Sequence, residues 1–71
     1  MSDDITEVGK FEPREYKGMF LMKMFHERPD LAGQQFLHTI GIYNVYSTNS
    51  PETFFLIDDH NKHYFLAREE H

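Results

Sequence analysis

The chain has no cysteine among its 71 residues, which excludes disulfides, thiolate metal sites and cysteine nucleophiles. A domain of this size buries only about 60% of the surface that its unfolded chain exposes. Without disulfides it must rely on aromatic burial, a His/carboxylate metal site or oligomerisation. Seven Phe and four Tyr favour aromatic burial and a homodimer.

Long apolar runs are also missing. None approaches the roughly 20 residues that span a bilayer. The acidic N-terminus lacks the apolar core of a secretory signal. We therefore expect a cytoplasmic protein with no membrane partner.

The chain also lacks a cluster of positively charged residues. Twelve acidic and seven basic side chains give a formal net charge of −5, and the seven cations are scattered along the chain. Nucleic-acid binding needs a basic patch, so direct nucleic-acid binding is disfavoured. The acidity is compatible with solubility or with a basic protein partner.

What the chain does contain is a set of apolar runs typical of strands. Residues 18–25 are apolar on both strand faces except at Lys23, and 36–46 are rich in β-branched and aromatic residues. Gly41 predicts a bulge or bend inside one long strand there. Runs 53–58 and 63–68 flank a predicted hairpin tip, where Asn61 suits the left-handed position.

These runs predict an all-β fold. We expect an antiparallel meander of three or four strands, curled into a sheet or an SH3-like barrel. A single domain over residues 11–71 would follow a flexible acidic arm, residues 1–10. The alternative is an α+β fold with one short helix around residues 29–39, because Asp30 can cap a helical turn.

Catalytic and metal motifs are weak. His60 and His63, beside Asp58 and Asp59, are the nearest approach to a divalent metal site, but H-x-x-H alone has little specificity. A polar hairpin tip, in which Asp and Asn cap the turn and the histidines face water, is the favoured interpretation. The chain has no Walker loop, G-x-G-x-x-G or G-x-S-x-G motif. We predict no enzymatic activity and no cofactor.

The aromatic residues therefore carry the functional prediction, because Tyr is enriched at protein interfaces. We expect a non-enzymatic protein-binding module or inhibitor, with an aromatic, acid-rimmed sheet face or an exposed strand edge as its docking surface. The predicted anchors are Tyr43, Tyr46 and Tyr64, and the charges that steer a basic partner are Asp58, Asp59, Glu69 and Glu70.

Three other functions remain open at this point. One is an acidic nucleic-acid mimic, of the kind that phages and mobile elements direct against host DNA- or RNA-processing enzymes. The second is metal binding at His60 and His63. The third is an OB-like nucleic-acid binder that stacks bases on its aromatic residues.

Overall fold

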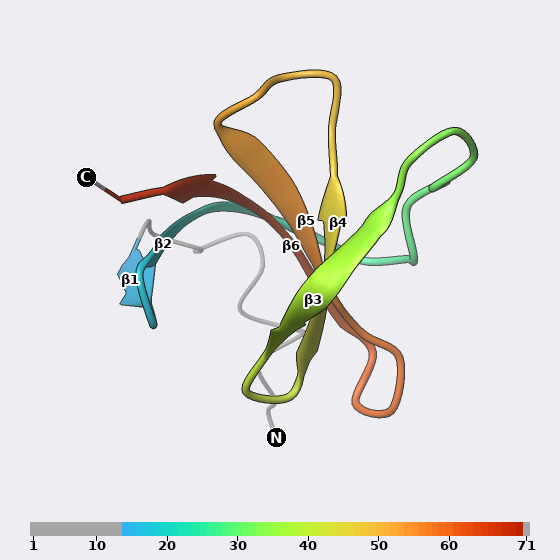
Figure 1. Ribbon diagram of the computed structural model, residues 1–71. Helices are drawn as coiled ribbons and strands as arrows, with labels where there is room; N and C mark the ends of the chain where they lie inside the picture. Colours follow the sequence, from blue (N-terminus) through green and yellow to red (C-terminus); the bar gives the residue numbers. More distant parts are fainter. Residues whose placement is uncertain (1–13, 71) are drawn as a thin grey trace.

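A computed structural model describes residues 14–70, which form one open antiparallel sheet of six strands (Figure 1). The strands are β1 (Arg14–Tyr16), β2 (Met19–Phe25), β3 (Phe36–Ile40), β4 (Tyr43–Ser47), β5 (Thr53–Asp58) and β6 (His63–Glu69). The all-β class is confirmed, while the expected number of strands was too low. The predicted arm, residues 1–10, lies outside the described residues.

The strand order across the sheet is β1-β2-β6-β5-β4-β3. Strands β3 to β6 form a meander, as expected, but β2 pairs with β6 and not with the next strand in sequence. The two outermost strands, β1 and β3, do not pair with each other, so the sheet does not close into a barrel. Residues 14–70 contain no helix, and the helical alternative around residues 29–39 is wrong.

Two tight turns account for the additional strands. Ile40 pairs with Tyr43, so Gly41 and Ile42 form a two-residue hairpin loop between β3 and β4. Gly41 has φ of +61°, as expected for the first loop position of a type II′ turn. The chain therefore reverses its direction at Gly41, where the sequence had predicted a bulge or bend within one long strand.

The second turn joins β1 to β2. Lys17 and Gly18 both have positive φ, 48° and 91°. Two successive positive φ values are characteristic of the type I′ turn, whose twist matches that of the flanking strands.

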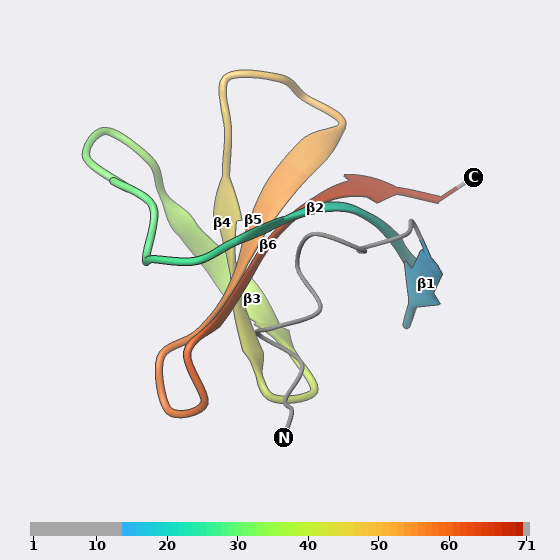
Figure 2. The same ribbon diagram turned by 180° about the vertical axis from the view of Figure 1, so that it is seen from behind.

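The sheet is strongly curved, and β2 and β6 bend along their length (Figure 2). Its two sides meet through side chains. The ring of Tyr16 on β1 meets that of Tyr43 on β4 edge to face, with centroids 5.2 Å apart, although three strands lie between β1 and β4 in the sheet. The Tyr16 hydroxyl occupies the space where any side chain at position 41 would lie, so this approach requires glycine there. The concave face holds the core: Met19, Leu21, Met24, Tyr43, Val45, Leu56, Phe65 and Ala67.

A ten-residue connection, residues 26–35, carries the chain from β2 to β3 past the three strands between them. Its first half is held by an ion pair between Arg28 and Asp59, at the β5–β6 turn. Its end is held by two hydrogen bonds between Gln35 and Ser47 on β4. The connection thus runs along the strand direction, from the end of the sheet at the β5–β6 turn to the opposite end, beside Ser47.

Candidate docking surface

The convex face of the sheet carries a continuous row of apolar side chains. The pairing register places Phe36 of β3 beside Tyr46 of β4, Tyr46 beside Phe55 of β5, and Phe55 beside Leu66 of β6. Paired residues on neighbouring strands share a face, so these four residues form one line across the strands, which we call the apolar row. With strands about 4.8 Å apart, the row is about 14 Å long.

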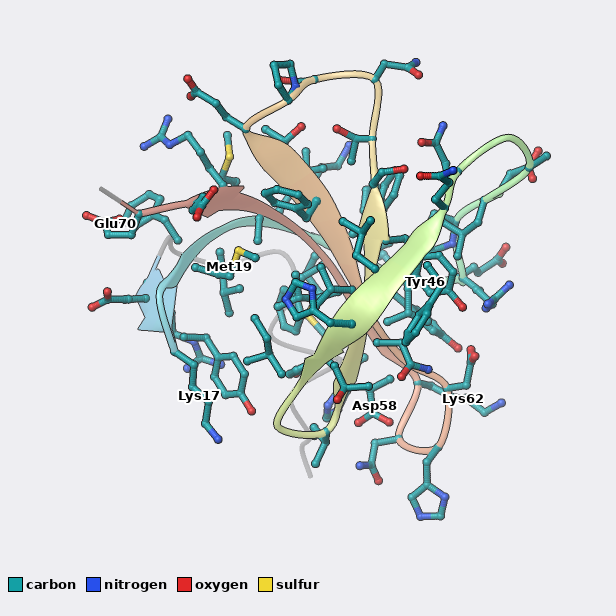
Figure 3. The ribbon with its side chains drawn as sticks, in the orientation of Figure 1. Lys17, Met19, Tyr46, Asp58, Lys62 and Glu70 are labelled. Carbon is teal, nitrogen blue, oxygen red and sulfur yellow. The ribbon has the colours of Figure 1, made fainter. Side chains whose placement is uncertain are left out.

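Ring contacts support this arrangement. The Phe36 and Tyr46 rings meet edge to face with centroids 5.6 Å apart. Phe25 of β2 packs its ring 6.2 Å from that of Phe55. Tyr46, labelled in Figure 3, is the member of the row that the sequence had predicted as an anchor.

The row is partly open to solvent, unlike the row next to it. Ile57 and Tyr64 share the convex face and are 1% and 6% exposed. In the apolar row, Tyr46, Phe55 and Leu66 are half-buried and Phe36 is 54% exposed. Apolar side chains left accessible in a continuous line are characteristic of interaction surfaces.

Two β-bulges lie beside the ends of the row. In β2 the register shifts between Leu21 and Lys23, which leaves Met22 as the extra residue; in β3 it shifts at Leu37. Both extra residues are exposed, Met22 at 37% and Leu37 at 41%. Bulges are common near functional sites, and these two add exposed apolar side chains on β3, which belongs to the row, and on β2, which adjoins it.

Two cations flank the β6 end of the row. Lys23 pairs with Leu66, and Arg68 lies two residues along β6 on the same face. The Lys23 ammonium lies 5.1 Å from the centroid of Phe25, and the Arg68 guanidinium lies 5.4 Å from that of Phe20. Within residues 14–70 the ion pair of Arg28 with Asp59 is the only one, so no described carboxylate neutralises Lys23 or Arg68.

The strand edges are poorer docking sites than this face. Strand β1 is three residues long and begins with the charged pair Arg14 and Glu15. Strand β3 is interrupted by its bulge at Leu37. Short charged edges and bulges are the features that prevent a sheet from adding another strand.

Two of the three predicted anchors belong to the interior. Tyr43 is 7% exposed and lies in the core beside Tyr16 and Phe65. Tyr64 is 6% exposed on the convex face. In this structure neither ring is accessible to a partner, because each completes the packing of one face of the sheet.

The four predicted steering carboxylates do not form one cluster. Asp58 and Asp59 lie at the start of the β5–β6 turn, whereas Glu69 and Glu70 lie at the far end of β6, about 20 Å away along that strand. Figure 3 shows Asp58 and Glu70 at opposite ends of the sheet. Asp59 is already paired with Arg28. Within residues 14–70, these four carboxylates therefore do not form an acidic rim around the row.

Asp58 is a turn residue. It is 4% exposed, and its carboxylate accepts hydrogen bonds from the backbone amides of His60 and Asn61 and from the Asn61 side-chain amide. Burial alone would raise its pKa, but these bonds, with His63 nearby, hold the pKa below the ordinary 3.8. The left-handed residue of this turn is Lys62, with φ of 60°, and not Asn61 as expected.

The distribution of charge also weakens the acid-rim prediction. Residues 1–13 hold four acidic side chains and one basic one, so three of the five net negative charges lie outside the described domain. The part of the chain that forms the sheet is close to neutral. An acidic nucleic-acid mimic would need closely spaced carboxylates on the sheet, and the positions of Asp59 and Glu69 do not supply them.

The histidines at the hairpin tip lack partners for a metal site. Among the described residues no group of three or more His, Cys, Asp or Glu side chains lies close enough to hold an ion. His60 is exposed, His63 is half-buried, and the Asp58 carboxylate between them is used by the turn. The polar-tip interpretation accounts for this segment.

The anchors predicted from the sequence did not include Phe36, Phe55 or Leu66. Each lies in a strand that is apolar at both parities, so composition alone could not assign one parity to the surface. The Gly41-Ile42 turn sets the pairing of Ile40 with Tyr43, but in regular register it would place Leu37 beside Tyr46. The bulge at Leu37 brings Phe36 there instead, and no local pattern in the sequence marks that bulge.

Comparison with known proteins finds no family model, no curated protein and no solved structure that matches the chain. Over residues 14–70 there is also no helix that is long and apolar enough to cross a membrane. Function is therefore inferred from the geometry of the sheet.

Proposed function

We propose that this chain is a non-enzymatic protein-binding module that docks through the apolar row. The observation that carries the proposal is the row itself: Phe36, Tyr46, Phe55 and Leu66 in direct register across four strands and accessible to solvent. Their burial by a partner would contribute favourable free energy at about 25 cal/mol per Å² of apolar surface removed from water. Aromatic side chains with little rotamer entropy are the usual anchors of such interfaces.

Site-specific photo-crosslinking tests this proposal. A benzophenone side chain replaces Phe36 in one variant and Ile42 in a control variant. Ile42 is equally accessible, at 59% exposed, but lies on the β3–β4 turn outside the row. In extract of the source cell, position 36 should give a discrete protein adduct that position 42 does not give. Equal adducts from both positions, or none from position 36, would refute docking through the row.

A single-stranded nucleic acid is the second candidate, because Lys23 and Arg68 lie beside aromatic rings on this face. Rings and cations together can stack bases and contact phosphates. The described sheet carries too few cations for the strong salt-dependent binding typical of that class. A labelled oligonucleotide that binds at low salt, and is released by Phe55→Ala, would favour this candidate over protein binding.

A further inference from the structure

The shape of the apolar row and the charges beside it indicate what kind of partner it can bind. This inference rests on the proposed function: the partner must fit a line of this length that is flanked by Lys23 and Arg68 at one end. Three candidates are a second copy of the chain, an extended peptide and an α-helix.

A second copy would need a much larger surface. A stable interface buries about 800 Å² on each partner. The molecule exposes 4736 Å², so such an interface would take about one sixth of its surface. The row is about 14 Å long, and Lys23, Arg68 and Glu15 occupy the surface beyond Leu66. The open apolar surface suits one secondary-structure element better than a whole domain.

An extended peptide fits the face poorly. Its same-face side chains repeat about every 6.8 Å, whereas the members of the row repeat about every 4.8 Å. Its backbone amides and carbonyls would also need partners, and a sheet offers free backbone groups only at its edges. Here one edge is short and charged and the other carries a bulge.

An amphipathic helix laid across the strands fits the spacing of the row and needs no backbone hydrogen-bond partner from the sheet. It satisfies its own backbone hydrogen bonds, and each turn advances about 5.4 Å, close to the strand spacing. Apolar residues at i, i+4, i+7 and i+11 would span about 16 Å, which matches the four members of the row. Such a helix needs about four turns.

The charges at the two ends of the row indicate which charged residues that helix should carry. Lys23 and Arg68 flank Leu66 at one end of the row, and no described carboxylate pairs with either. At the other end, β3 and β4 contain no Lys or Arg. The surface is thus apolar along its length and carries net positive charge at one end, where Lys23 and Arg68 outnumber Glu15. That end complements a helix that carries carboxylates at the corresponding position.

We propose that the apolar row binds an acidic amphipathic α-helix of about four turns, oriented across the strands, with its carboxylates beside Lys23 and Arg68. This reverses the sign of the partner expected from the sequence. The net acidity that suggested a basic partner lies mostly in residues 1–13, whereas the cations lie beside the row.

An unbiased selection tests this inference. A displayed library of random 16-residue peptides is selected on the full chain, and the recovered peptides are tested against Phe36→Ser. The inference expects peptides with apolar residues at helical spacing and Asp or Glu toward one end, whose binding falls at least tenfold with Phe36→Ser. Basic or non-helical sequences with the same dependence would overturn the helix inference but leave docking through the row intact. Peptides indifferent to Phe36→Ser would overturn both.

Charge reversal provides the second test. With a selected acidic peptide, Lys23→Glu should weaken binding by about tenfold, a change of about 1.4 kcal/mol. Arg14→Glu is the matched control, since Arg14 is exposed and lies opposite Leu21, on the other face of the sheet. Arg68→Gln gives an independent check if Lys23→Glu perturbs folding. Equal weakening by Arg14→Glu, or no effect of Lys23→Glu and Arg68→Gln, would overturn the orientation and the acidic partner.

Discussion

Replacing Gly41 by Ala tests the contact through which the sheet curls onto itself. Position 41 has φ of +61°, where an L side chain costs about 1–2 kcal/mol. A Cβ atom there would lie 3.2 Å from Cζ of Tyr16 and closer still to its hydroxyl oxygen, and an overlap of this kind typically costs about 1–3 kcal/mol more. We therefore expect Gly41→Ala to lower the free energy of unfolding by about 2–5 kcal/mol.

A double-mutant cycle separates the two costs. In the Tyr16→Phe background the overlapping oxygen is gone, so Gly41→Ala should cost the backbone contribution and a smaller contribution from the remaining close contact with Cζ. The coupling energy should therefore be positive and at most about 1–3 kcal/mol. Gly33→Ala is the matched control, because Gly33 has φ of 84° but nothing within 4 Å of an added Cβ. Urea unfolding followed by circular dichroism measures each variant. An equal cost of Gly41→Ala in the parent and in the Tyr16→Phe background would show that the Tyr16 hydroxyl does not limit position 41.

The remaining predictions concern burial and charge. Asp58→Ala should cost about 1–3 kcal/mol, because it removes the three hydrogen bonds that this buried carboxylate accepts. Asp59→Ala should cost at most about 1 kcal/mol, since its ion pair is exposed. Urea unfolding of both variants measures the difference. Because folding lowers the pKa of Asp58 below 3.8, its contribution to stability is complete above that value and is lost as the pH falls through the lower folded pKa. Acid titration of stability should therefore be flatter for Asp58→Asn than for the parent. Leu56→Ala, in the fully buried core, should lower the free energy of unfolding by about 2–5 kcal/mol. Ile42→Ala, at an exposed position, should lower it by about 0.5 kcal/mol or less. Similar thermal midpoints for the two variants would contradict the assignment of the core.

The strand regions were predictable from the sequence because apolar and β-branched runs are local signals. Runs 53–58 and 63–68 match β5 and β6 within one residue, and the hairpin between them is confirmed. The error at Gly41 has a physical cause. A glycine inside an apolar run is compatible with a bulge, a bend or a type II′ turn, and only tertiary pairing decides among them.

The pairing of β2 with β6 could not be predicted from local sequence. It brings together residues that lie far apart in the chain, such as Phe25 and Tyr64, and no turn specifies it. The missing information is that the 26–35 connection reaches across the sheet, fixed by Arg28 at one end and Gln35 at the other. Both contacts use ordinary polar residues that have no distinctive pattern in a sequence.

Which residues form the candidate docking surface also depends on how the strands pair. In strands that are apolar at both parities, the composition cannot tell which residues face the core, and a register shift of one residue would exchange the faces. The bulges at Met22 and Leu37 shift the register inside two strands of the sheet. Without the first bulge, the alternation along β2 could not place Leu21 and Met24, three residues apart, in the same core. The bulges therefore have two consequences: they let both halves of a strand contribute to one core, and they leave exposed apolar residues beside the apolar row. A variant that deletes Leu37 should restore regular alternation in β3 and leave Phe36 paired with Tyr46 and His38 paired with Val45 on their present faces. Docking that depends on the apolar row alone should therefore survive the deletion, whereas docking that depends on the bulge should lose affinity although the sheet still folds.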